Sequence, residues 1–151
     1  MPAGIFQLRD SSDLLEKLRH DFARVRADTM DPYAAFDFFM TAEHMVDWLF
    51  PKSKADREKL RDAPLLALCS HIANGAKHFE ATAKHHKSFS ESQVHRGSFS
   101  SDFSSDFDIS GLVIILDGGA KKEFGAKIYV IDLAEKILRY WEDRLKKNEN
   151  A

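Results

Sequence analysis

A row of polar side chains follows one side of a helix predicted over residues 64–85. His71 and His78 are seven residues apart, with Asn74 and Lys77 between them. Seven residues complete almost two helical turns, with a drift of about 20°, so these side chains share one side of the helix. An imidazole exchanges a proton near neutral pH, and a lysine ammonium can contact phosphate. This histidine row is therefore a candidate for acid–base chemistry or for ligand binding.

A second polar strip lies on the helix predicted over residues 32–50. Asp37, Thr41, His44 and Asp47 interrupt a segment that is otherwise mostly apolar, and their spacing puts them along one side. A helix that is apolar over most of its circumference is buried, which makes this the predicted central helix of the domain. The histidine row borders the core face of its own helix. We therefore expect the strip and the row to meet in a polar seam, because buried polar groups are rarely unpaired.

The residues alone leave two interpretations of this seam open. In the first, the seam is structural, and His44 or His78 hydrogen-bonds a carboxylate of the strip to fix how the helices pack. In the second, His44 and Asp47, three residues apart, join His71 and His78 as ligands for zinc, manganese or iron. However, His71 and His78 are about 10 Å apart along the helix axis, too far to share one ion directly. We therefore assign no metal ligand and expect no cofactor.

A third interpretation comes from a resemblance. Residues 73–78 (ANGAKH), late in the third helix, resemble the RNA-cleaving site of HEPN proteins, which are helical bundles of prokaryotic defence and toxin–antitoxin systems. The resemblance implies metal-independent cleavage of RNA across a homodimer, with His78 catalytic, Asn74 the polar spacer residue and Lys77 a phosphate contact. The family motif is R-x4-6-H, but residues 71–73 contain no arginine, and no arginine of the chain precedes a histidine at that spacing. The resemblance thus implies an RNA-binding or interaction domain with a degraded active site.

A second resemblance covers more residues. Residues 35–48 (AFDFFMTAEHMVDW) and 69–79 (CSHIANGAKHF) resemble the helix-two and helix-three motifs of a bacterial helical-bundle family that has no established activity. This resemblance implies a fold class but no reaction.

The elements that must position these residues follow from hydrophobic periodicity and end signals. Asp31 and Pro32 are typical of a helix start. Apolar runs around an Asp-Gly-Gly turn favour a β-hairpin. We predict helices over residues 12–27, 32–50, 64–85 and 132–147, a Ser/Asp-rich loop over 88–110 and a β-hairpin over 111–131. The fold class is mostly α, an antiparallel bundle of four main helices with a β-hairpin inserted before the last helix, in one domain.

Composition limits the function classes. The 151 residues are 44% hydrophobic and 30% charged, with a net charge of −2, which is typical of a globular protein and argues against wholesale coating of nucleic acid. No apolar run is long enough to span a membrane, and no leader sequence is recognised. A single cysteine, Cys69, excludes an internal disulfide and favours a reducing cytoplasm. The expected partners are RNA or another protein, including a second copy in a homodimer.

Overall fold

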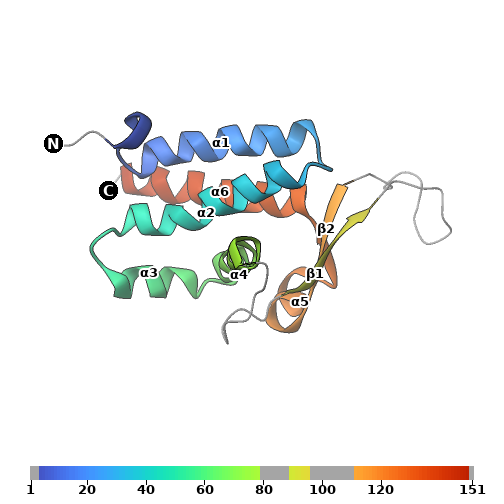
Figure 1. Cartoon of the computed structure of the whole chain (residues 1–151). Coiled ribbons are helices and arrows are strands. Elements are labelled where there is room, and N and C mark those ends of the chain that lie inside the picture. Colours follow the sequence, from blue (N-terminus) through green and yellow to red (C-terminus); the bar gives the residue numbers. More distant parts are fainter. Residues whose placement is uncertain (1–3, 79–88, 96–110, 150–151) are drawn as a thin grey trace.

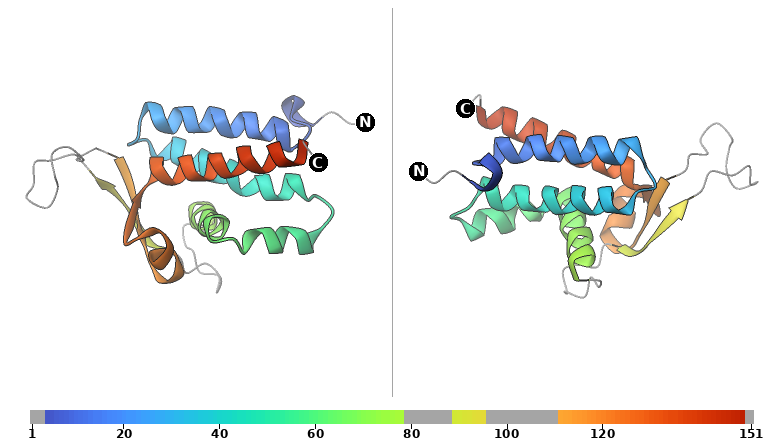
Figure 2. Two further views of the ribbon diagram at one scale, coloured as in Figure 1. Left: turned by 180° about the vertical axis from the view of Figure 1, so that it is seen from behind. Right: turned by 45° about the horizontal axis from the view of Figure 1, so that its top comes forward.

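The computed structural model describes residues 4–78, 89–95 and 111–149, and it describes only the backbone at residues 5, 76–78, 89–95, 148 and 149. Helices α1 (Ser11–Ala27), α2 (Pro32–Leu49) and α6 (Val130–Glu149) lie side by side, and α4 (Pro64–His78) crosses them steeply (Figures 1 and 2). The short helix α3 (Lys54–Arg61) packs against α2 and α4. The short 3₁₀ helix Ile5–Gln7 and the C-terminal end of α6 lie at the same end of the bundle.

The mostly helical fold class is confirmed, and most helix ends lie within two residues of their predicted positions. Asp31 caps α2 as expected, since its carboxylate accepts hydrogen bonds from the backbone N–H groups of Tyr33 and Ala34. The last helix begins at Val130, two residues before the predicted start. The predicted residues 79–85 of the third helix lie outside the described residues.

The strands differ from the predicted hairpin in two respects: a third strand is added at the edge, and a helix replaces the tight turn. Strands β1 (Phe89–His95), β2 (Gly111–Leu116) and β3 (Lys127–Tyr129) form one antiparallel sheet in the order β1-β2-β3. The pairing of β2 with β3 is confirmed, but helix α5 (Gly118–Phe124) joins them where a tight turn was expected. Asp117 caps this helix, and Gly125, at φ 95°, ends it.

Strand β1 occupies residues that were predicted to be part of a loop. Its sequence, FSESQVH, is largely polar, so it lacks the apolar alternation by which strands are recognised. It lies at the edge of the sheet and pairs with the apolar strand β2 through the backbone. Edge strands are often polar because a polar edge discourages pairing with other chains. The loop predicted over 88–110 is therefore wrong at residues 89–95, and its remaining residues lie outside the described ones.

The core lies between α1, α2, α4 and α6, and Figure 1 shows the sheet against one end of these helices. Trp141 and Phe38 are its largest fully buried side chains. α2 is central, as expected, but one side of its N-terminal part faces solvent, where Tyr33 is 78% and Phe36 43% exposed. In the described part of the chain, no helix is long and apolar enough to cross a membrane.

Candidate functional site

The first half of the polar strip on α2 faces α1. Asp37 Oδ2 accepts a 2.6 Å hydrogen bond from Arg24 Nη1 of α1. One turn further on, the Thr41 hydroxyl donates a 2.6 Å hydrogen bond to Oδ2 of Asp21, a residue only 1% exposed. Lys17 Nζ lies 2.7 Å from the same carboxylate oxygen and 2.9 Å from Thr41 Oγ1. Asp37 and Thr41 therefore join α2 to α1.

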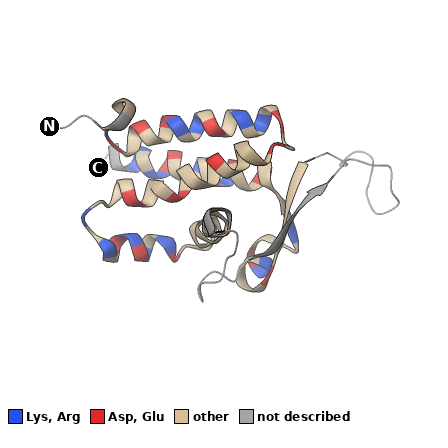
Figure 3. Ribbon diagram, in the orientation of Figure 1, with Lys and Arg blue, Asp and Glu red and all other residues tan. Residues whose placement is uncertain are grey.

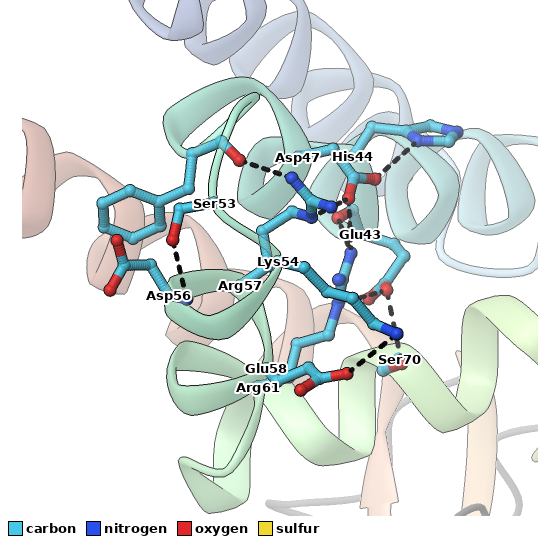
Figure 4. A network of polar contacts seen from close by, with 11 residues as sticks. Glu43, His44, Asp47, Ser53, Lys54, Asp56, Arg57, Glu58, Arg61 and Ser70 are labelled. Carbon is cyan, nitrogen blue, oxygen red and sulfur yellow. Dashed lines mark hydrogen bonds and ion pairs between the residues drawn. The ribbon is translucent and has the colours of Figure 1, made fainter.

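The second half of the strip faces α3. Arg61 Nε lies 2.8 Å from Glu43 Oε1, and Arg61 Nη2 lies 3.2 Å from Asp47 Oδ1. Arg57 Nε lies 3.6 Å from the same Asp47 oxygen, and Arg57 Nη1 donates a 2.7 Å hydrogen bond to the carbonyl oxygen of Phe50. Figure 4 shows both arginines reaching from α3 toward the carboxylates of α2. We call Glu43, Asp47, Arg57 and Arg61 the α2–α3 network.

Helical geometry explains why the strip divides. At about 100° per residue, Asp37 and Asp47 point about 80° apart around α2 and cannot face one neighbour. Glu43 and Asp47 are four residues apart, as are Arg57 and Arg61, and this spacing aligns each pair along one helix face. Glu43, Arg57 and Arg61 were not among the residues predicted from the sequence. The sequence does hold a signal for these residues, because an acidic pair four residues apart on one helix is followed by a basic pair with the same spacing on the next.

Burial raises the pKa values of two side chains near α4, Glu43 and Cys69. Desolvation raises the pKa of Glu43, and this outweighs the opposing effects of Arg61 and of the Ser70 hydroxyl, which donates a 3.3 Å hydrogen bond to Glu43 Oε1. Desolvation also raises the pKa of the Cys69 thiol well above its usual range. Cys69 is therefore a protonated core side chain rather than a nucleophile.

The histidine row on α4 is only partly described. His71 is 1% exposed and belongs to the interior, and Asn74 is half-buried. Lys77 and His78 lie in the last turn of α4, and their side chains are outside the described ones. Asp37 contacts Arg24 of α1, and Asp47 contacts His44 of its own helix and Arg57 and Arg61 of α3. The seam between these carboxylates and the histidine row stays a prediction, since the side chains of Lys77 and His78 lie outside the described ones.

His44 lies away from the core. Its side chain is 50% exposed, and its Nδ1 lies 3.5 Å from Asp47 Oδ2. His71 is buried, whereas His44 faces solvent. Over residues 4–75 and 111–147, whose side chains are described with one exception, no group of three or more His, Cys, Asp or Glu residues could hold a metal ion.

A groove of about 690 Å³ lies beside the α2–α3 network, at the end of the bundle where the chain begins. We call it the Phe6 groove. Its lining residues come from residues 4–10, the end of α2 with Pro51, and α3. They are Gly4, Phe6, Leu8, Arg9, Asp10, Asp47, Trp48, Pro51 and Arg57. Asp47 and Arg57 thus belong both to the groove and to the network.

The first turn of the chain holds Phe6 in an exposed position. Phe6 and Gln7 have φ values of 56° and 67°, in the left-handed region that costs a non-glycine residue about 1–2 kcal/mol. A Cβ atom at Gly4 would overlap the carbonyl oxygen of Leu8, so this turn requires glycine there. The Phe6 side chain is 91% exposed. Strained backbone of this kind persists where the surrounding structure holds it, and it is enriched at functional sites.

Figure 3 shows basic and acidic residues interspersed along α1, α3 and α6. Comparison with known proteins found no matching family model, no similar curated protein and no similar solved structure.

Proposed function

We propose that the protein is a helical interaction module that binds another protein, and that the polar residues between its helices have a structural role. One observation carries this proposal: the two carboxylates of the predicted seam, Asp37 and Asp47, are each held by arginines of a neighbouring helix. Each of these ion pairs joins α2 to a neighbouring helix, which is a structural role.

Exposed aromatic side chains support the same proposal. Phe6 is 91%, Tyr33 78% and Phe36 43% exposed, whereas soluble monomers cover most of their large aromatic side chains. Aromatic residues are enriched in protein–protein interfaces, where they supply large contact area at low entropic cost. A second copy of the chain is one partner that this proposal admits, and the reduced Cys69 thiol is consistent with a cytoplasmic location.

The competing function is RNA binding or cleavage of the HEPN-like kind, with His78, Asn74 and Lys77 as its residues. The test is incubation of the purified protein with a mixed RNA pool, first in EDTA and then with manganese or zinc, followed by a denaturing gel. His78→Ala is the test variant, and His20→Ala, at an exposed position of α1, is its matched control.

An interaction module leaves the RNA intact under every condition, in the wild type and in both variants. Cleavage in EDTA that is lost in His78→Ala but kept in His20→Ala would overturn the proposal in favour of a ribonuclease. Cleavage that needs added metal would overturn it in favour of the metal interpretation. Light scattering on the same samples shows whether the chain pairs with itself.

A further inference from the structure

We propose that α3 is a detachable segment of the fold: it leaves α2 and α4 as one unit while the other helices stay folded, and the ion pairs of the α2–α3 network hold it in place. Such a motion does not depend on the identity of a binding partner, so it goes beyond the proposed function.

Few apolar contacts attach α3 to the rest of the molecule. Its sequence, KADREKLR, contains two apolar residues, Ala55 and Leu60, and none of its residues is fully buried. Ala55 is exposed, whereas Leu60 is partly buried against the core. The helices α1, α2, α4 and α6 each bury several apolar side chains. Segments with few buried apolar contacts open at a lower free energy than the core does, so α3 opens before the other helices unfold.

The α2–α3 network supplies the remaining attachment. Arg61 contacts two carboxylates of α2, with Nε 2.8 Å from Glu43 Oε1 and Nη2 3.2 Å from Asp47 Oδ1. Arg57 contacts the same Asp47 oxygen and the carbonyl oxygen of Phe50. Figure 4 shows both arginines reaching from α3 toward α2. Contacts of this kind depend on charge, so dissolved salt weakens them by screening.

The docked position of α3 also carries an energetic cost. Glu43 contacts Arg61 of α3 and Ser70 of α4, and its side chain is only 19% exposed. Desolvation has a larger effect on the pKa of this carboxylate than either contact has. Removal of a charged pair from water offsets much of the Coulomb attraction between its members. The free energy of undocking is therefore smaller than the number of ion pairs suggests.

The length of α3 makes undocking and unwinding a single event. The helix has eight residues, and an isolated helix of that length is unstable in water. Pro51 follows α2 and Pro64 begins α4, so neither neighbouring helix continues into α3. When α3 leaves its neighbours, its backbone hydrogen bonds are therefore lost together, and its amide protons become open to exchange with solvent.

The test is amide hydrogen exchange of the full chain, followed residue by residue by NMR. The slowing of exchange at each amide gives an opening constant, which is the ratio of open to closed molecules at that position. Amides within Leu133–Leu138 of α6, a stretch of the buried core, are the internal reference. The test variant is Arg61→Met. Its matched control is Lys54→Met, which removes an exposed ion pair with Glu58 in the same helix.

We expect the amides of α3 to share one opening constant that is larger than that of the α6 reference and nearly independent of low urea concentrations. An increase from about 0.1 M to about 1 M sodium chloride shortens the Debye length from about 10 to about 3 Å, and it should raise this constant roughly threefold or more. Arg61→Met should raise it about fivefold or more, since Glu43 then loses its cation. Lys54→Met should change it by about twofold at most.

Three results would each overturn the proposal. Exchange of α3 and of the α6 reference with one common constant would show that α3 does not detach separately. Opening constants that decrease gradually from the ends of α3 toward its middle would show fraying in place of undocking. An α3 opening constant that does not respond to salt, or that responds equally to Arg61→Met and Lys54→Met, would show that the network does not hold the helix.

Discussion

Arg61 of α3 and Glu43 of α2 form an ion pair of 2.8 Å, Nε to Oε1, between side chains that are only 24% and 19% exposed. The pair matters because α3 contributes no fully buried residue to the core. Its apolar anchor is Leu60, which is partly buried against the core. The position of α3 on α2 is therefore fixed largely by ion pairs.

Replacement of Arg61 by Met should lower the free energy of unfolding by about 1–3 kcal/mol. Glu43 would stay mostly buried without its cation, and an unpaired buried charge costs more than a pair gains. Urea denaturation measures this difference. The matched control is Lys54→Met, which removes an ion pair with Glu58 whose side chains are 80% and 67% exposed. That change should stay within about 0.5 kcal/mol, and equal effects of the two variants would contradict the importance of burial.

Burial of Glu43 should make the free energy of unfolding depend on pH. Desolvation raises its pKa in the folded protein, so the folded state holds this proton to a higher pH than the unfolded chain does. The contribution of Glu43 to stability is therefore fully present below the usual glutamate pKa of about 4.3, and it is lost as pH rises through the folded pKa.

The Glu43→Gln variant isolates this effect because it cannot ionise. The unfolding free energy of the wild type minus that of Glu43→Gln should fall as pH increases above about 4. Urea denaturation at several pH values up to 7 measures the difference. An increase with pH would mean that the ion pair with Arg61 outweighs desolvation.

The Thr41 hydroxyl should stabilise the protein through Asp21. Thr41→Val keeps the shape of the side chain but removes the 2.6 Å hydrogen bond to a carboxylate that is 1% exposed. The expected loss is about 1–3 kcal/mol, the usual cost of a buried group that loses a partner. Thermal unfolding measures it, with Thr41→Ser, which keeps the donor, as the comparison. If Thr41→Ser loses stability and Thr41→Val does not, packing of the methyl group is responsible instead.

Replacement of Trp141 by phenylalanine should lower the free energy of unfolding less than the complete burial of Trp141 suggests. Its indole Nε1 has no hydrogen-bond partner among the described residues, so Trp141→Phe removes a polar group that is not paired there. The ring also packs edge-on against Tyr140, with centroids 5.2 Å apart, and phenylalanine can keep that contact. Trp141→Ala should cost about 3–5 kcal/mol and Trp141→Phe clearly less. Similar losses in urea denaturation of the two variants would show that the indole is needed.

The sequence by itself determined the elements that depend on local patterns. The apolar spacing in α1, α2 and α6, and the cap at Asp31, are properties of neighbouring residues, and they predicted these helices closely. The pairing of β2 with β3 was also predicted, because both segments are apolar and β-branched. The polar edge strand β1 and the helix α5 were missed, since neither carries a strong local pattern.

Only the tertiary structure decided which polar residues meet. Asp37 and Asp47 look equivalent in the sequence, yet one contacts Arg24 of α1 and the other contacts arginines of α3. The directions of these two side chains around α2 differ by about 80° after ten residues. The packing of the neighbouring helices then determines which helix each side chain faces. The Phe6 groove arises in the same way: Phe6, Trp48 and Arg57 are far apart in the chain, and only the fold brings them together.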